Sequence, residues 1–331
     1  MKLIRTKTVW LMAWLMAALM YSAAWAGGEI KLALDCPPDP NKCGTYLWAT
    51  TFEAEAKAGG LSIKLYPRDA LGGEDEKLDQ VSQGLLEISC SDTAKAASID
   101  ETIFGFHLPF LWENQEHAYR VLTKSGVMDK VNNVTTKQGV RVLALVPLGG
   151  MGGFAVTKDT IKTPADFKGV RMRAMNNQQV EMYKAWGANS VVIPWSEIYN
   201  ALQTGVADGY MNPPLVPIMF KHTELIKNFS VVNMSCGTRA IIASEDWYAG
   251  LSQKDRAVVD GAAAKASDTA WKWSIQVAEK SLKDLQDSGI NVYRNTSAEK
   301  AQFAKLVRPV YPQIVPKKVA DYFVEIADKY R

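Results

Sequence analysis

The stretch KGVRMRAMN, residues 168–176, places two arginines one residue apart in a segment typical of a β-strand. Because side chains of a strand alternate between its two faces, Arg171 and Arg173 are expected on one face, opposite Val170 and Met172. A guanidinium that points into a cleft can hold a carboxylate or sulfonate through two parallel, charge-assisted hydrogen bonds. The alternative is a solvated surface for both side chains. The spacing therefore indicates a candidate anion-binding group without choosing between the two arginines.

Common enzyme motifs are absent from the sequence. There is no GxSxG elbow, HExxH motif, Walker lysine loop or GxGxxG loop after a strand. His107 lies between apolar neighbours, as a core histidine does, and neither His117 nor His222 has a visible nucleophile arrangement. There is also no CxxC pair for zinc. We therefore expect no catalysis, no cofactor and no metal.

The elements that would position the arginines follow a βα pattern. Strand-like segments alternate with helix-like segments in both halves, which indicates βαβ units and largely parallel sheets. The apolar segment 231–243 is long enough to cross between two lobes. A chain of this length, beyond its first residues, is more consistent with two lobes than with one domain.

The first 26 residues have the features of a secretory signal peptide. Three basic residues come first, the run 9–21 is apolar and uncharged, and Ala24 and Ala26 give the small-x-small cleavage pattern. A membrane anchor is the alternative for an apolar run of this length. Without this segment the chain has equal numbers of basic and acidic residues. We therefore expect a periplasmic protein with no basic field for nucleic acid.

Four cysteines follow the leader, in a compartment where disulfides form. Cys36 and Cys43 flank a short proline-rich loop, which predicts a disulfide between them. Cys90 and Cys236 lie in strand-like segments far apart in the sequence, so either a second bridge or two buried free thiols is consistent with the pattern.

A series of short motifs resembles the substrate-binding proteins of tripartite ATP-independent periplasmic (TRAP) transporters. In order they are LYP (65–67) with ALGGE (70–74), QGLLEI (83–88), LPFL (108–111), IKTPADFKGVRMR (161–173), WSEIYNALQTG (195–205) and VADGYMNP (206–213). The resemblance covers nearly the whole chain after the leader. It implies an α/β, two-lobed periplasmic binding protein with a ligand cleft between the lobes and hinge crossings.

The resemblance also implies which residues bind the ligand. Arg173, at the second basic position of its motif, matches the arginine that clamps a carboxylate, whereas Arg171 is expected to be a surface residue. Trp195 matches an aromatic that packs on the ligand, and Asn212 an asparagine that hydrogen-bonds it. The further positions expected near the ligand are Ser91, Asp92, Asp35, Met175, Met234, Gly153 and Phe154.

Simpler interpretations exist for several of these residues. Trp195 follows a proline and is equally typical of a core aromatic. Asn212 precedes two prolines and suits a turn. Asp92 suits a surface acid or a helix cap.

One departure from the family pattern bears on the ligand. Many members carry a second arginine ahead of the 161–173 motif, where this chain has Gly152 and Gly153. A second ligand carboxylate would then lack a partner, and an unpaired charge in a cleft is costly. The sequence therefore predicts a ligand with one anionic group, with Phe154 and the glycines leaving room for a bulkier tail. Arg239 is a possible replacement cation at an uncertain position.

These observations predict an extracytoplasmic receptor that delivers a small organic anion, with one carboxylate or sulfonate, to the permease subunits of a TRAP transporter. We expect a monomer. Residues 27–150 and about 238–277 are expected to form one lobe, and residues 151–237 and about 278–331 the other. The alternatives are a secreted two-domain hydrolase, a sensor ectodomain and the binding protein of an ATP-driven importer.

Overall fold

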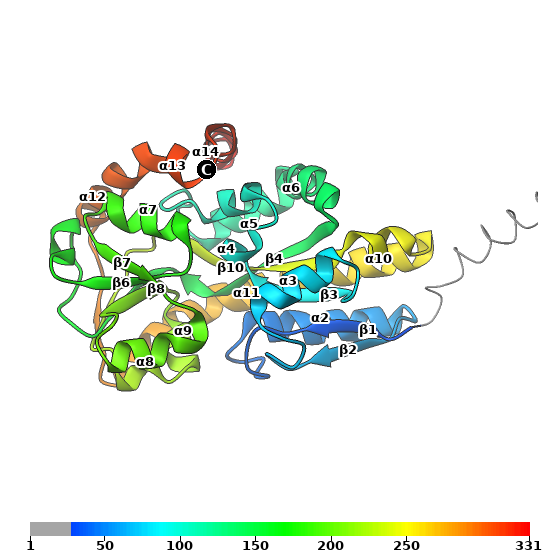
Figure 1. The fold of residues 1–331 in the computed structure, drawn as a ribbon, viewed down its shortest axis with the longest axis horizontal. Helices are drawn as coiled ribbons and strands as arrows, with labels where there is room; N and C mark the ends of the chain where they lie inside the picture. The colour runs from blue at the N-terminus through cyan, green and yellow to red at the C-terminus, as the bar shows by residue number, and fades with distance from the viewer. Residues whose placement is uncertain (1–27) are drawn as a thin grey trace, which may run out of the picture.

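Residues 28–331, described in a computed structural model, are built around two β-sheets (Figure 1). The predicted signal peptide, residues 1–26, lies outside the described residues. Sheet A has the strand order β2-β1-β3-β10-β4 and sheet B the order β11-β9-β5-β8-β6-β7. In Figure 1 sheet B lies to the left with α7, α8 and α9, and β1, β2 and α2 lie to the right. Two sheets covered by helices give the α/β architecture expected from the sequence.

The elements of sheet A come mainly from the first half of the chain. Its strands are β1 (Ile30–Ala33), β2 (Ile63–Tyr66), β3 (Ile88–Asp92), β4 (Val140–Met151) and β10 (Cys236–Ser244). Its helices are α2 (Gly44–Ala58), α3 (Glu74–Ser82), α4 (Thr93–Ala96), η1 (Glu101–His107), α5 (Gln115–Lys124), α6 (Val127–Thr135) and α10 (Glu245–Gly250), with the short η2 (Thr136–Gln138) before β4.

The elements of sheet B come mainly from residues 153–230. Its strands are β5 (Gly153–Val156), β6 (Arg171–Ala174), β7 (Asn189–Val192), β8 (Gly209–Asn212), β9 (Asn228–Ser230) and β11 (Asn291–Tyr293). Its helices are η3 (Pro164–Phe167), α7 (Asn177–Ala185), η4 (Trp195–Glu197), α8 (Ile198–Gln203), α9 (Leu215–Met219) and η5 (His222–Glu224). The chain ends in α11 (Gln253–Asp287), α12 (Ser297–Val307), η6 (Arg308–Val310), α13 (Tyr311–Ile314) and α14 (Lys317–Lys329).

The expectation of largely parallel sheets is wrong, because both sheets are mixed. β10 runs antiparallel to β3 and β4, and β5 runs antiparallel to β8 and β9. The reason is the route of the chain between the sheets. The chain leaves sheet A through β4 and comes back beside it through β10, so these two strands have opposite directions. An alternation of strands and helices in the sequence carries no information about such distant pairing.

Three segments connect the two sheets. β4 ends at Met151 and β5 begins at Gly153, so a single residue lies between them. Residues 231–235 return from β9 to β10, as the sequence predicts for this segment. The two crossings are joined, because Gly152 N donates to Ser235 O at 2.7 Å and Met234 N donates to Gly152 O at 3.0 Å. The long helix α11 is the third connection and packs on α2 and β4 as well as on α9 and β11.

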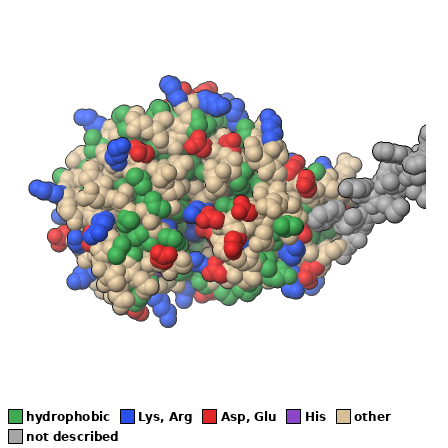
Figure 2. All heavy atoms as spheres, in the orientation of Figure 1, with side chains coloured by type: hydrophobic (Ala, Val, Ile, Leu, Met, Phe, Trp, Pro, Cys, Tyr) green, Lys and Arg blue, Asp and Glu red, His purple; other side chains and the backbone are tan. Residues whose placement is uncertain are grey.

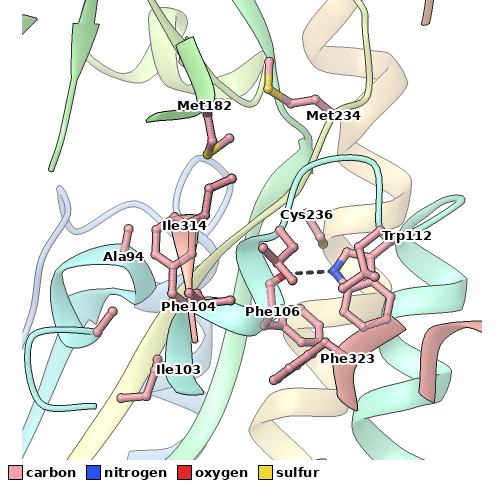
Figure 3. Packing of buried hydrophobic residues seen from close by; sticks show 14 of the residues in the cluster. Ala94, Ile103, Phe104, Phe106, Trp112, Met182, Met234, Cys236, Ile314 and Phe323 are labelled. Atoms are coloured by element: carbon pink, nitrogen blue, oxygen red, sulfur yellow. Dashed lines mark hydrogen bonds between the residues drawn. The ribbon is translucent and has the colours of Figure 1, made fainter. Parts of the chain in front are cut away.

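The C-terminal helix α14 returns to the elements of sheet A. His117 Nε2 shares a hydrogen bond with Ala327 O at 2.9 Å, and Arg120 Nε donates to Tyr330 O at 2.7 Å. Figure 3 shows the Trp112 indole nitrogen reaching the Phe106 carbonyl, with Phe323 of α14 beside them. The lobe boundaries expected from the sequence stay a prediction, and α14 is a C-terminal element that packs on η1 and α5.

The predicted disulfide between Cys36 and Cys43 is confirmed. It closes the loop between β1 and α2, and Cys43 Sγ accepts a hydrogen bond from Tyr46 N at 3.3 Å at the start of α2. Cys90 and Cys236 are buried free thiols. Burial raises the pKa of the Cys90 thiol well above its ordinary value, so this thiol stays protonated.

We predict that Gly105→Ala weakens the attachment of α14. A Cβ at position 105 would lie 2.2 Å from ring atoms of Phe323, which is itself fully buried. Overpacking of this kind costs about 1–3 kcal/mol of unfolding free energy, measurable by urea denaturation. Gly261→Ala is the matched control, because a Cβ there meets nothing within 4 Å and alanine favours the helix. Equal stability of the two variants would contradict the packing described for α14.

Candidate functional site

The two arginines of β6 have different environments. Arg171 is exposed and its Nη2 donates to Gly205 O at 3.2 Å, whereas only 2% of Arg173 is exposed. In the strand register Arg173 lies between Val191 of β7 and Tyr210 of β8. Met172 is fully buried in the hydrophobic core, which fixes the orientation of the strand. Arg173 is therefore the interior cation, as the resemblance implies, and Arg171 is at the surface.

Arg173 is a buried cation with spare donors. Its Nε donates to Ile193 O at 2.8 Å, and its guanidinium carbon lies 5.5 Å from the centre of the Trp195 ring. Within residues 28–331 no acidic side chain forms a salt bridge with it, and only Nε has a hydrogen-bond partner. Burial lowers the pKa of Arg173 to about 10, and the negative charge of Glu74 acts in the opposite direction. The side chain is therefore charged at neutral pH and has both terminal nitrogens available for an anion.

Aromatic side chains surround Arg173 on one side. Trp195 packs edge-to-face against Tyr210 and Phe220, at centroid distances of 5.7 and 4.9 Å. The Tyr210 hydroxyl shares a hydrogen bond of 2.9 Å with His222 Nδ1. We call Arg173, Trp195, Tyr210, Phe220 and His222 the Arg173 group. Trp195 is half-buried, so its edge-to-face packing leaves part of its surface open to a ligand.

Sequence reasoning identified Arg173 and Trp195 in this group and missed the other three. Tyr210 lies two residues before Asn212 on β8, so strand alternation could have indicated that both face the same way. His222 and Phe220 follow α9 in a segment without a recognisable pattern, and only the fold brings them to Trp195. Asn212 is half-buried and pairs with Gly153 in the register of β8 and β5.

A second charged group lies at the ends of β1 and β3 in sheet A. Arg239 forms salt bridges with Asp35, at 2.5 Å from Nε to Oδ2, and with Asp92. Glu74 Oε1 accepts hydrogen bonds from Ser91 Oγ, at 3.0 Å, and from Asp92 N. We call these five residues the acidic group, because two carboxylates pair with the guanidinium and a third, that of Glu74, is bonded to the neighbouring Ser91 and Asp92. Figure 2 shows acidic side chains gathered over the part of the surface where α3, which begins with Glu74, lies in Figure 1.

This arrangement changes the interpretation of Arg239. The sequence left it as a possible replacement for the missing second arginine, but two carboxylates already neutralise it. Asp35 is held further by Thr45 Oγ1, which donates to Oδ1 at 2.8 Å. Asp92 also caps α4, because its Oδ1 accepts from Ala94 N at 2.8 Å. Asp92 is therefore a helix cap as well as a partner of Arg239.

Contacts across the two sheets bring the acidic group and the Arg173 group together. Asn176, just after β6, donates from Nδ2 to Ala94 O of α4 at 2.9 Å. The Arg68 guanidinium carbon lies 5.3 Å from the centre of the Phe220 ring, in cation–π contact. The influence of Glu74 on the pKa of Arg173 follows from the same proximity. In the sequence Glu74 was only the last residue of the ALGGE motif, and the structure adds its link to Arg173.

Other predicted positions are not brought into the Arg173 group. Phe154 is fully buried and packs edge-to-face on Phe167 and Trp186, at 5.0 and 5.7 Å between ring centroids. Its partner in the register of β8 is Met211, so it faces the side of sheet B opposite to Tyr210. Met234 is fully buried in the same core cluster, and Met175 packs against that cluster.

Gly153 has a structural reason to be glycine. A Cβ at this position would lie 2.5 Å from Ser230 O and 2.7 Å from the Phe229 ring. Contacts this short require the backbone of β9 to move, so no larger residue fits without rearrangement. The structure therefore has no space for a second arginine side chain at position 153.

Neither a metal centre nor a membrane span is found between residues 28 and 331. No group of three or more histidine, cysteine or acidic side chains there could hold a metal ion. No helix in the same part of the chain combines the length and apolar character needed to cross a bilayer.

The comparisons with known proteins agree with this geometry. The family model for bacterial extracellular solute-binding proteins, family 7 (DctP) matches residues 37–318, so the chain belongs to this family. The ectoine/5-hydroxyectoine-binding periplasmic protein UehA of Ruegeria pomeroyi is 29% identical over 246 residues, covering 73% of this chain and 72% of that protein. The C4-dicarboxylate-binding periplasmic protein DctP of Rhodobacter capsulatus is 28% identical over 262 residues, covering 78% of each.

Solved structures confirm the two-lobed periplasmic binding protein fold. The ectoine-binding protein of the TeaABC TRAP transporter from Halomonas elongata has a TM-score of 0.85 at 22% identity, covering 91% of this chain and all of that one. The sugar acid binding protein DctPAm of Advenella mimigardefordensis, solved with galactonate, has a TM-score of 0.84 at 24% identity, covering 92% and 99%. Membership of this solute-binding family removes the hydrolase alternative.

We predict that His222 makes the protein less stable in acid. Burial lowers the pKa of His222 from 6.5 to about 4, so the unfolded chain takes up a proton more readily than the folded one between these values. The contribution of the neutral His222 to the unfolding free energy is therefore fully present above pH 6.5 and is lost as the pH decreases towards 4. Between pH 6.5 and 4, protonation of His222 should cost the parent about 1.4 kcal/mol of unfolding free energy for each pH unit. A His222→Gln variant lacks this group and should not show this part of the loss.

The measurement is a series of urea unfolding curves from pH 8 to pH 4.5 for both proteins. At pH 8 the imidazole is neutral in both states, so any difference there reports the lost contacts of the ring with Tyr210, Trp195 and Phe220 and not its charge. Parallel pH profiles of the parent and the variant would contradict the assignment of a buried, neutral His222.

Proposed function

We propose that the protein is a periplasmic receptor for a small organic solute with one carboxylate or sulfonate, which it delivers to the permease subunits of a TRAP transporter. The observation that carries this proposal is Arg173, a buried guanidinium with no acidic partner among the described residues. An uncompensated buried charge destabilises a protein unless something neutralises it. An anionic ligand neutralises this charge and is oriented by the two terminal nitrogens.

The charges around Arg173 support a single ligand anion. Arg239 is neutralised by Asp35 and Asp92, and Gly153 leaves no space for another cation. Glu74 adds a negative charge close enough to raise the pKa of Arg173. A second carboxylate on the ligand would therefore meet carboxylates instead of a cation. A zwitterion with its carboxylate on Arg173 and its positive part towards Glu74 satisfies both sides.

The relatives bind solutes of different charge. UehA is named for ectoine and 5-hydroxyectoine, which are zwitterions, and the Rhodobacter capsulatus protein for C4-dicarboxylates. The charges around Arg173 in this chain favour a zwitterion over a dicarboxylate. In our proposal Trp195 packs on the body of the ligand and Asn212 donates a hydrogen bond to it. Ser91, Asp92 and Asp35 act from the facing lobe.

Because the Arg173 group lies on sheet B and the acidic group on sheet A, a ligand that contacts both favours closure of the two lobes. A ligand that touches Arg173 on sheet B and the acidic group on sheet A binds the closed arrangement more tightly than an open one, which shifts the population to the closed form. The closed form is then the one that docks on the permease. Residues 1–26 and the periplasmic relatives support a location in the periplasm.

We predict that Arg173→Ala lowers ligand affinity at least about tenfold, because it removes the charge-assisted pair. Thermal-shift titration with ectoine, galactonate, taurine and succinate identifies a ligand for the parent, and calorimetry then gives its Kd for each variant. Arg171→Ala is the matched control, since it removes an arginine from the same strand at an exposed position. Unchanged affinity in Arg173→Ala would rule out the clamp.

We predict a preference for single anions and zwitterions over dianions in the same screen. At equal ligand concentration, a ligand raises the unfolding free energy by RT ln(1 + [L]/Kd), so the ligands with the lowest Kd give the largest increases in melting temperature. Glu74→Gln should reduce the difference in affinity between these ligands and dianions, because it removes a negative charge near the ligand. A larger increase in melting temperature with succinate than with every monoanion and zwitterion would overturn the single-anion proposal. The proposal that the protein is a solute receptor would still stand.

A further inference from the structure

A cavity separate from the Arg173 group lies between α12 and the segment 110–113. Its volume is about 630 Å³, which is within the range of pockets that hold small organic molecules. Its floor is apolar and includes Leu111, Trp112 and Val232, all almost fully buried. In Figure 1 α12 lies on the same edge of the molecule as α13 and α14, where the chain ends.

The cavity is on the opposite side of sheet B from Arg173. Phe303 of α12 packs on Phe154 and Trp186, with 5.7 and 5.8 Å between ring centroids. Phe154 faces away from Tyr210 in the register of β5 and β8, and Tyr210 is the neighbour of Arg173. A molecule in this cavity and a ligand on Arg173 would therefore occupy different sites.

The rim of the cavity carries an excess of positive charge. It is formed by Lys300, Lys305, Arg308 and Arg331, with Glu113 as the one acid among the described lining residues. Arg331 is paired, with its Nη1 3.3 Å from Glu113 Oε1 and its Nε 2.9 Å from Asp328 Oδ1. Arg308 Nη2 donates to Phe110 O at 3.0 Å. The part of the chain that the structure describes offers no acidic partner within salt-bridge distance to Lys300, Lys305 or Arg308.

Lys300 is the least solvated of these cations. It is half-buried, and burial lowers the pKa of its amino group, with Arg294 acting in the same direction. An ammonium in this position is stabilised by an anion that enters the cavity. The three cations without acidic partners in the described chain therefore favour a negatively charged occupant.

The wall of the cavity is also held in a strained backbone conformation. Phe110 has a φ angle of 58°, in the left-handed region that bulky residues rarely adopt, whereas Asn233, at 53°, is of a type that tolerates this region. The two segments are joined by a hydrogen bond from Phe110 N to Met234 O. Such strain is retained where the surrounding structure requires it and is concentrated at binding sites. Here it keeps Phe110 and the apolar floor next to the crossing segment 231–235.

We propose that this cavity binds an amphiphilic organic anion, with its apolar body on Leu111, Trp112 and Val232 and its acidic group on Lys300, Lys305 and Arg308. The floor and rim match the two halves of such a molecule, and the volume matches its size. This site is independent of the solute bound through Arg173, so the proposal holds whichever solute the receptor carries.

The experiment is a fluorescence titration of the purified protein with 8-anilinonaphthalene-1-sulfonate, an apolar ring system with one sulfonate. The double variant Lys300→Gln/Lys305→Gln is expected to raise the Kd of the probe at least about tenfold, because two charge-assisted contacts are lost. The control is Lys280→Gln/Lys283→Gln, which removes the same charge from exposed positions on α11 that are paired with Asp284 and Asp287. The control should bind the probe like the parent.

Two further arms distinguish the proposed site from the Arg173 group and from purely apolar binding. Arg173→Ala should keep the affinity for the probe, and loss of binding in that variant would place the probe on Arg173 and overturn the proposal. N-phenyl-1-naphthylamine, which lacks the sulfonate, should bind more weakly than the sulfonate probe and be insensitive to the lysine substitutions. Equal binding of the sulfonate probe by the Lys300/Lys305 variant and the parent would also overturn it. Thermal unfolding of each variant checks that the fold is retained.

Discussion

The arrangement of this protein depends on one buried cation, Arg173, which has no counterion among residues 28–331. Arg173 is placed in the interior by β6, whose neighbouring residue Met172 is anchored in the hydrophobic core. Keeping a guanidinium there is costly, and its Nε bond to Ile193 O compensates only part of the charge. The aromatic rings of Trp195 and Tyr210 limit water on one side of it. In our proposal an anionic ligand supplies the missing counterion.

Arg173 and Arg239 are both withdrawn from solvent but have different neighbours. Arg239 lies between Asp35 and Asp92, so its charge is satisfied within the protein and it ties β10 to the ends of β1 and β3. Arg173 has aromatic rings and a carbonyl instead. The two arginines differ in the side chains around them and not in burial, since both are largely withdrawn from solvent. The proposed preference for a ligand with one anionic group rests on this difference between the two arginines.

Sequence reasoning predicted the features that depend on local order and missed those that depend on distant pairing. The Cys36–Cys43 bridge, the crossing segment after β9 and the interior position of Arg173 follow from short patterns and family motifs. Strand alternation put Arg171 and Arg173 on one face and could not show that only one is buried. The partners of Arg239, the approach of Glu74 to Arg173 and the packing of Phe154 depend on strands far apart in the chain. No local pattern encodes these contacts.

The helix α11 sets a mechanical condition on any movement between the lobes. It is one uninterrupted helix of 35 residues, held to sheet A by Trp271 Nε1, which donates to Leu145 O at 3.0 Å, and in contact with α9 and β11 further along. Separating the sheets must therefore either flex this helix or slide α9 and β11 along it. Long helices bend gently, so flexing acts like a spring. In the closure that we propose, α11 would therefore act as an elastic load against which the two sheets separate.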